Sequence, residues 1–204
     1  MLNFTSDAEA WATIRATFLA KGYAFFEGHL NLNLVGIRMP SALPDRFDDY
    51  LICTYEVGEH KRFHLWPCTT DPGQAYRDSP LNPNGTAVME PQQVRRSYRA
   101  GKHRGRPALV QRGTHPKYRR VTSEGTWGPV RSESIGLNIH DAGRDVNVDS
   151  KVGKASAGCQ VLAYRSDMRM LLHLVEEANQ AGQGEWLSYT LLRFEDLVKN
   201  TALG

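Results

Sequence analysis

The sequence has few cysteines, no long apolar run and no secretory-type beginning. Its 204 residues include three cysteines, Cys53, Cys68 and Cys159. Three are too few for a disulfide framework, and an odd count leaves at least one thiol free. No apolar run approaches the ~20 residues that span a bilayer, so we expect no membrane span. The start, MLNFTSDAEAW, lacks a basic stretch followed by an apolar one, so we expect a protein made in the cytoplasm without a signal peptide.

Acidic residues are missing from one long segment, residues 95–120. This segment carries ten Lys and Arg residues and no Asp or Glu, although the net charge of the whole chain is only +3. The simplest interpretation is a solvated face, and the alternative is a contact surface for an anionic polymer or for nucleic acid. Aromatic residues here are limited to Tyr98 and Tyr118. Because stacking-based binding needs more of them, we expect no nucleic-acid partner.

Two helices are indicated near the ends of the chain. Ser6 and Glu9 form a capping box, and apolar residues then recur at helical spacing, which predicts a helix over residues 6–21. Ser166 can cap a second helix that ends near Gly182. Both helices are amphipathic and can therefore pack on a sheet.

The middle of the chain has the pattern of β-structure. Between residues 23 and 131, short runs rich in β-branched and aromatic residues alternate with turn residues, which predicts antiparallel sheet. The runs 134–140 and 159–164 are shorter, and 185–194 predicts a late strand. No repeat or low-complexity linker divides the chain, so we expect one domain.

The pair His140 and Cys159 is the strongest chemical feature. A cysteine attacks a carbonyl as thiolate, which requires a nearby imidazole to take its proton and N–H groups to hold the oxyanion. Ser156-Ala157-Gly158 directly precedes Cys159, and small residues let the backbone approach a substrate closely. We expect N–H groups around Gly158 to be free at a strand end. A buried core thiol is the alternative interpretation of Cys159.

These residues resemble the active-site signature of L,D-transpeptidases of the YkuD type. That signature is a His followed, after a spacer of similar length, by Ser/Thr-His-Gly-Cys. The segment NPNGTAVMEP is similar to the Thr-Pro-x-Gly-Thr-Phe segment that these enzymes carry upstream. The resemblance covers roughly residues 30–192, with its specific part at 137–162. The SAGCQV version is similar to a group of phage-encoded proteins.

The resemblance implies an α+β, mainly β fold with an antiparallel β core and peripheral helices. Residues 1–204 would form a single catalytic domain, with 1–28 as an N-terminal helical appendage and 165–182 as a peripheral helix. It also implies an enzyme that acts on bacterial peptidoglycan without a cofactor or metal. Its site residues would be Cys159 forming a thioester, His140 as general base, Gly158 in the oxyanion hole and Ser156 supporting the turn.

Two departures from the signature affect the expected activity. Ala157 replaces the histidine of the family, and the arginine common after the cysteine is absent from Gln160-Val161-Leu162. Losing the residues that handle an amine acceptor leaves water as the second substrate. We therefore expect a phage-type lysin that reaches the wall after the host membrane is permeabilised, with cross-link formation by transpeptidation as the alternative.

Several other residues are candidates for substrate binding. Arg119, Arg120 and Arg112 can bind a stem-peptide carboxylate by bidentate contacts, and Ala157 and Gln160 flank the nucleophile. His103 is either a substrate-binding residue or a turn histidine. Asp141 follows His140, but adjacent strand residues point to opposite faces, so its carboxylate is expected to cap a loop and not to orient the imidazole.

Three further interpretations remain open. His60, His64 and Cys68 have a spacing that permits zinc, although Pro67 interrupts the strand and a fourth ligand is missing. A glycan-cleaving enzyme would instead use carboxylates such as Glu124, Glu133 or Asp141. A non-enzymatic binder would use the basic segment 95–120.

Overall fold

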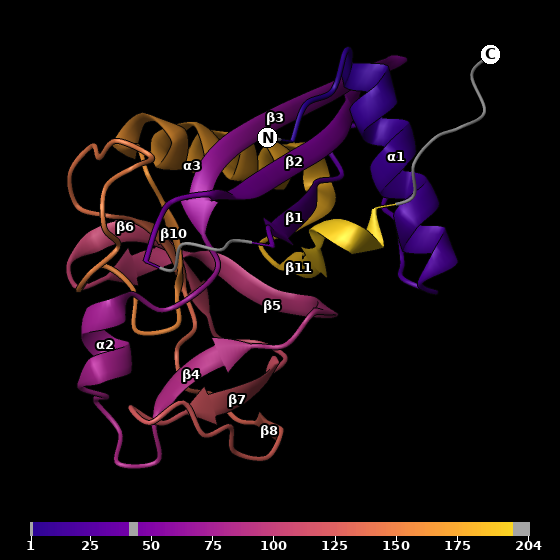
Figure 1. Cartoon of the computed structure of the whole chain (residues 1–204). Coiled ribbons are helices and arrows are strands. Elements are labelled where there is room, and N and C mark those ends of the chain that lie inside the picture. Colours follow the sequence, from indigo (N-terminus) through magenta and orange to yellow (C-terminus); the bar gives the residue numbers. More distant parts are fainter. Residues whose placement is uncertain (1, 41–44, 198–204) are drawn as a thin grey trace.

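Eight strands of the computed structural model close into a barrel, and the structure describes residues 2–40 and 45–197. In hydrogen-bonding order the barrel strands are β1 (Asn33–Arg38), β11 (Leu187–Arg193), β5 (Gln92–His103), β6 (Arg106–Gln111), β9 (Ile139–Asp141), β10 (Gln160–Leu162), β3 (His60–Thr69) and β2 (Asp49–Val57). A separate small sheet contains β4 (Thr86–Met89), β7 (Lys117–Val121) and β8 (Arg131–Ser132). Figure 1 shows this small sheet below the barrel.

The barrel is mixed and not purely antiparallel. β1 pairs with β11, and β9 pairs with β10, in parallel, whereas the remaining neighbours are antiparallel. The expected α+β, mainly β class is thus confirmed, but the expectation of an antiparallel core is wrong at these two pairs. A parallel pair needs a long crossover, and the segment between β9 and β10 supplies it.

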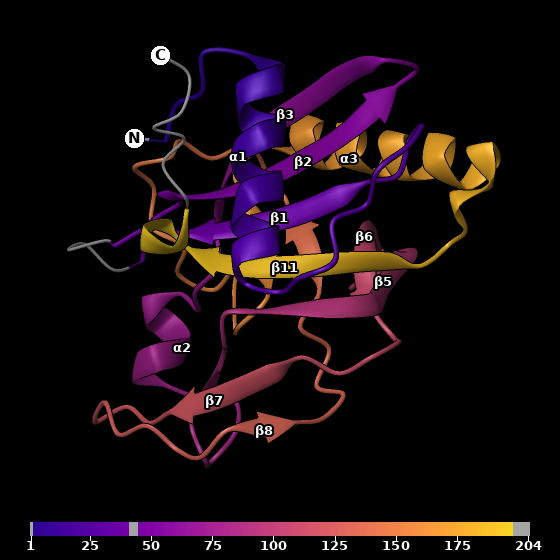
Figure 2. The same cartoon turned by 90° about the vertical axis from the view of Figure 1, so that its right-hand side faces the viewer.

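Helices cover the outside of the barrel. They are α1 (Asp7–Ala20), α2 (Gln74–Asp78) and α3 (Arg165–Ala178), with a π turn η1 (Asn179–Gln183) and a 3-10 turn η2 (Phe194–Asp196). Figure 2 shows α1 lying across β1, β2 and β3, while α3 runs along the other side of β2 and β3. α2 lies beside the small sheet (Figure 1).

The predicted N-terminal helix is confirmed. The Ser6 hydroxyl accepts from the Glu9 N–H at 3.1 Å, as a helix cap requires. The Glu9 carboxylate reaches back to the Thr5 N–H and not to Ser6. Ile14 and Phe18 are fully buried and join one apolar cluster with the outer faces of β1 and β2.

The second predicted helix begins at Arg165, as the expected range 165–182 has it, but its capping residue differs from the expected Ser166. Tyr164 is its N-cap residue and Ser166 lies inside α3, so the prediction of a Ser166 cap is wrong. The Asp145 carboxylate, brought in from the β9–β10 crossover, accepts from the Arg165 N–H at 2.7 Å and does the capping. The predicted end near Gly182 is correct, because Gly182 has a φ of 87° within η1.

The main core fills the barrel. Tyr98, Tyr189 and Leu109 are fully buried there, and Met168 and Leu171 of α3 pack against the same cluster. This packing fixes the strands that carry the chemically interesting residues.

A hydrogen bond inside this core holds the loop that leads to β9. The buried Tyr98 hydroxyl donates to the Leu137 carbonyl at 2.8 Å. We expect Tyr98→Phe to lower the free energy of unfolding by about 1–2 kcal/mol, because the carbonyl keeps its burial and loses its donor. Urea denaturation measures this, and Tyr164→Phe at a partly exposed tyrosine is the control, with an expected change below about 0.5 kcal/mol. Equal effects in the two variants would contradict the prediction.

Candidate active site

His140 and Cys159 come together at the parallel β9–β10 pair. His140 lies in β9 opposite Val161 of β10, and Cys159 directly precedes β10. The Cys159 sulfur and a ring nitrogen of His140 are within 4.8 Å of each other. The predicted meeting of these two side chains at neighbouring strand ends is therefore confirmed.

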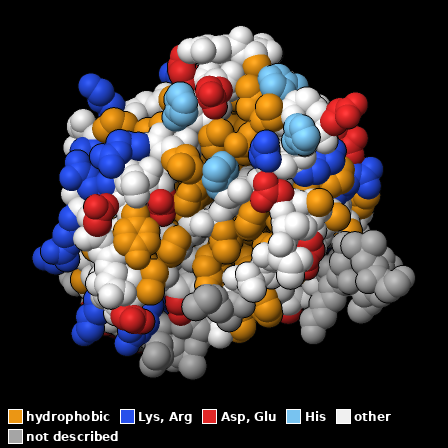
Figure 3. Space-filling model, turned by 90° about the horizontal axis from the view of Figure 1, so that it is seen from above, with side chains coloured by type: hydrophobic (Ala, Val, Ile, Leu, Met, Phe, Trp, Pro, Cys, Tyr) orange, Lys and Arg blue, Asp and Glu red, His pale blue; other side chains and the backbone are white. Residues whose placement is uncertain are grey.

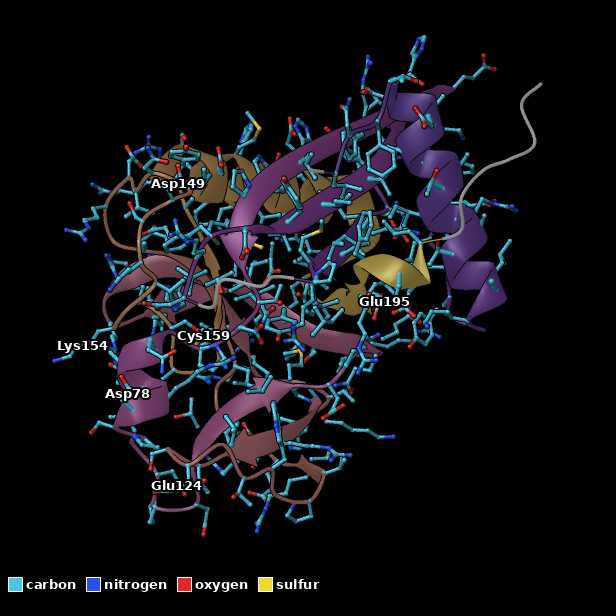
Figure 4. The ribbon with its side chains drawn as sticks, in the orientation of Figure 1. Asp78, Glu124, Asp149, Lys154, Cys159 and Glu195 are labelled. Atoms are coloured by element: carbon cyan, nitrogen blue, oxygen red, sulfur yellow. The ribbon has the colours of Figure 1, made fainter. Side chains whose placement is uncertain are left out.

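A cavity of about 410 Å³ opens onto this pair. Its walls come from the tip of the β5–β6 hairpin, from β4 and β7 of the small sheet, from α2 and from the loop before Cys159. Figure 4 shows Cys159 between the barrel and the small sheet, on the side of α2. Cys159 lines this cavity, and its volume is in the range of small-molecule sites.

Cys159 differs from the other two cysteines in its accessibility. Cys53 and Cys68 are buried, whereas Cys159 is partly exposed and lines the cavity. Burial raises the pKa of Cys53 to about 12 and makes it unreactive. Burial also raises the pKa of Cys159, against the opposing effects of the Asn138 N–H and the Arg104 charge. In the resting protein Cys159 is consequently a thiol, and its sulfur lies 3.6 Å from the Gly136 carbonyl oxygen.

His140 is held as a neutral base. Its Nδ1 lies 2.7 Å from the carbonyl oxygen of Asp141, and because a carbonyl only accepts, Nδ1 carries the proton and Nε2 has the lone pair. Burial lowers the pKa of His140 to about 4, which keeps the ring uncharged near neutral pH. The Asp141 carboxylate accepts from the Gly143 N–H and so caps a loop, as expected. The imidazole is oriented instead by the Asp141 backbone carbonyl.

His103 stacks on His140. The two ring centroids are 4.6 Å apart with an interplanar angle of 21°. His103 ends β5, and the two-residue turn Arg104-Gly105, with φ of 49° and 80°, returns the chain into β6. His103 therefore lines the cavity and is more than the turn histidine that was the alternative interpretation.

Hydrogen bonds of the Ser156 side chain stabilise the loop before Cys159. The Ser156 hydroxyl donates to the Cys159 carbonyl at 2.7 Å and accepts from the Gly158 N–H at 3.1 Å. Ser156 thus supports the turn in the way expected. The expectation of a free N–H is wrong for Gly158, while the Cys159 N–H has no hydrogen-bond partner within the described ranges.

Gly158 is required by the geometry of this loop. Its φ is 124°, and an added Cβ would lie 2.5 Å from the Ala87 carbonyl oxygen of β4. We expect Gly158→Ala to destabilise the fold by at least about 2 kcal/mol and to displace Cys159. Gly153→Ala is the matched control, because Gly153 also has a positive φ but an added Cβ would have nothing within 4 Å. Chemical denaturation compares the two, and an equal loss would exclude the clash as the cause.

The other predicted site residues divide into two groups. Ala157, Asp141 and Arg120 line the cavity. Arg119 pairs with Glu90 at 3.0 Å and does not line it. Gln160 is 1% exposed and accepts from the Tyr189 hydroxyl at 3.0 Å inside the barrel, so it supports the core and does not reach a substrate.

Three cations of the cavity wall were not among the individual residues predicted to bind substrate. Arg104, Arg106 and Lys154 line it together with Arg120, and Asp141 is the one carboxylate among the lining residues. The signal was present in the turn HRGRP next to His103, because the side chains that flank a two-residue hairpin turn share its tip. The wall consequently attracts a ligand with carboxylates.

The basic segment 95–120 does not form a single face. Arg95 lies over the Phe26 ring, Arg99 over the Trp186 ring, and Arg106 pairs with Asp141 at 3.7 Å. The separate contacts of Arg95, Arg99 and Arg106 give little support to an extended polymer-binding surface formed by this segment. The face seen from above in Figure 3 has Lys and Arg mainly toward the rim, with hydrophobic and histidine side chains in the middle.

The metal alternative at His60, His64 and Cys68 is not supported. His64 stacks between Tyr55 and Trp66, and Cys68 is buried. Across the described part of the chain, the group with metal-compatible spacing is instead His103, His140 and Cys159, whose ligand atoms lie within 4.8 Å of one another. The Asn138 amide nitrogen donates to His103 Nδ1, so the other ring nitrogen of His103 carries the proton and has no lone pair for a metal. The group therefore fits a pair of imidazoles beside a thiol better than a metal centre.

The carboxylate alternative lacks a pair. Glu124 is exposed and lies at the far end of the small sheet from Cys159 (Figure 4). Glu133 is exposed and pairs with Arg131 at 3.7 Å. Glycoside hydrolysis needs two carboxylates facing one cavity, and of these three residues only Asp141 lines it.

In the described part of the chain, no helix has the length and apolar character to cross a membrane. In comparisons with protein-family models, with curated proteins and with solved structures, nothing matches this chain.

Proposed function

We propose that this protein is a cysteine-dependent peptidoglycan hydrolase that cleaves the stem peptide through a thioester at Cys159. One observation carries the proposal: the Cys159 sulfur lines a cavity and lies within 4.8 Å of a ring nitrogen of His140, a neutral imidazole whose free nitrogen is a proton acceptor. A thiol close to a proton-accepting imidazole supports nucleophilic acyl transfer. The resemblance of His140 and Ser156-Ala157-Gly158-Cys159 to the L,D-transpeptidase signature then favours peptidoglycan as the substrate.

The chemistry proceeds in two halves. His140 Nε2 takes the thiol proton while the sulfur attacks the amide carbon, and the carbonyl oxygen becomes an oxyanion. The C–N bond breaks, the amine leaves with the proton from His140, and the acyl group remains on sulfur as a thioester. Water then attacks the thioester, again with His140 as base, which releases the acid and restores the thiol.

The uncharged state of both partners defines the type of mechanism. Burial raises the pKa of Cys159 and lowers that of His140 to about 4. A stable thiolate–imidazolium pair would need the reverse order. Proton transfer is therefore coupled to attack on the substrate, and His140 acts as a general base.

The charge of the cavity supports an acidic peptide substrate. Four cations and one carboxylate line the wall, and that carboxylate is already paired with Arg106. Stem peptides carry free carboxyl groups beside their amide bonds. Guanidinium groups bind such carboxylates in pairs of hydrogen bonds, which would hold the peptide across Cys159.

Hydrolysis is favoured over cross-linking by the residues next to the nucleophile. Ala157 replaces the histidine expected to handle an amine acceptor, the expected arginine is absent from Gln160-Val161-Leu162, and Gln160 is buried in the core. Water is then the remaining acceptor. The corresponding cellular role is that of a phage-type lysin acting on the wall from inside the host.

Mass spectrometry of fragments released from purified peptidoglycan tests the proposal. Wild-type protein is expected to release peptides with new amino and carboxyl ends, and Cys159→Ala and His140→Ala are expected to release none. Trapping with acid should recover a wild-type protein heavier by one acyl group at Cys159. New cross-links without released fragments would establish transpeptidation instead, and reducing-sugar ends in all variants would establish glycan cleavage.

A further inference from the structure

His103 and His140 are stacked, yet their hydrogen-bond partners differ in kind. His140 Nδ1 faces a backbone carbonyl, which only accepts. His103 Nδ1 lies 2.9 Å from the side-chain nitrogen of Asn138, which only donates. The two rings are therefore held in opposite tautomers.

The orientation of the Asn138 amide decides the tautomer of His103. The Gln111 N–H donates to Asn138 Oδ1 at 2.9 Å, deep in the barrel wall. Because the oxygen must face this donor, the NH₂ group must face His103. It donates to His103 Nδ1, so the proton of the neutral ring is on Nε2.

His103 is also kept neutral. Burial lowers its pKa, and the charges of Arg104 and Arg106 lower it further. A neutral imidazole with one N–H polarises a carbonyl without giving up its proton. Because Asn138 occupies Nδ1, Nε2 is the ring nitrogen that remains available to the cavity that His103 lines.

The oxyanion that forms at Cys159 needs such a donor. Two or more donors usually hold it, but the Gly158 N–H is already bound by the Ser156 hydroxyl. The Cys159 N–H supplies one donor. A ring nitrogen of His103 lies within 4.8 Å of the Cys159 sulfur. When the sulfur bonds to the carbonyl carbon of the substrate, the carbonyl oxygen can lie between the sulfur and this nitrogen.

We propose that His103 is a second catalytic histidine, which donates a hydrogen bond from Nε2–H to the oxyanion formed at Cys159 and transfers no proton. This inference rests on the proposed acyl transfer at Cys159. The two imidazoles thus have separate tasks: His140 accepts the thiol proton, and His103 stabilises the negative charge on the oxygen.

Nitrogen NMR of the wild-type protein tests the tautomers without any substrate. Two-bond ¹H–¹⁵N spectra distinguish a protonated from an unprotonated ring nitrogen. We expect His103 to be protonated at Nε2 and His140 at Nδ1. A proton on Nδ1 of His103 would overturn the proposal, whatever the protein hydrolyses.

Kinetics of stem-peptide cleavage test the role. His103→Phe keeps a ring to stack on His140 and removes the donor, so kcat is expected to fall about 100-fold with little change in KM. His103→Gln keeps a side-chain N–H and is expected to lose less than about tenfold. His173→Phe is the matched control, because His173 is exposed on α3 and does not line the cavity, and it is expected to retain wild-type kcat.

Alkylation of Cys159 by iodoacetamide separates this role from a structural one. Alkylation forms no oxyanion, so its rate should change less than twofold in His103→Phe if the thiol and His140 are undisturbed. A parallel loss of alkylation and cleavage, or cleavage unchanged in His103→Phe, would overturn the proposal. Cleavage that persists in Cys159→Ala would instead overturn the proposed function while leaving the NMR result intact.

Discussion

Replacing Cys159 by serine is expected to lower the rate of stem-peptide cleavage at least about a thousandfold. The reason lies in the weakness of the base. Burial lowers the pKa of His140 to about 4, so the imidazole has little driving force to remove a proton from a hydroxyl, whose pKa is far above that of a thiol. Sulfur is therefore essential, and chromatographic quantification of released peptides measures the loss.

The other thiols provide the internal control for this variant. Cys53 and Cys68 are buried and do not line the cavity. Peptide mapping after alkylation of the native protein should find the label on Cys159 alone. Cleavage retained within tenfold in Cys159→Ser, or prominent label on Cys53, would show that Cys159 is not the nucleophile.

The pH dependence of Cys159 alkylation is expected to be steep, with a rise of about 100-fold between pH 6 and pH 8. Burial holds the pKa of the thiol above its ordinary value, and below its pKa the thiolate fraction increases tenfold per pH unit. The same protein unfolded in urea is the control. Its thiol has a pKa of about 8.5, so its rate should level off above about pH 9, whereas the rate of the folded protein should continue to rise. A rate that is already level at pH 6 would indicate a preformed thiolate–imidazolium pair.

Peptide cleavage is expected to depend on pH in a different way. His140 is competent as a base only while it is unprotonated, and its pKa is about 4. The rate should therefore be level between about pH 5.5 and 8 and fall below about pH 4.5, as the ring takes up a proton. Steady-state kinetics with a soluble stem peptide provide the profile, and a fall already near pH 6.5 would mean that His140 titrates as in an unfolded chain.

Local sequence patterns were sufficient for much of the fold. Residues 6–21 combine a cap with helical periodicity, and the long apolar runs that became β2, β3 and β11 have strand periodicity. β5, the longest strand with 12 residues, lies within the predicted β segment 23–131 but does not show this periodicity. Its outer face is charged, and an irregular residue, Arg96 with φ of 52°, interrupts the alternation between Val94 and Tyr98. Both effects remove the pattern on which a strand prediction depends.

By itself the sequence determined one part of the site, the pair His140 and Cys159. These two residues are close along the chain, and the small residues before Cys159 allow a substrate to approach its thiol. The tertiary structure alone decided the rest. It brought His103 from 37 positions before His140 onto the same cavity, placed the cations of the hairpin tip on its wall, and turned Gln160 and Arg119 away. The physical reason is that barrel closure and strand register, and not neighbouring residues, set which side chains meet and which way the Asn138 amide points.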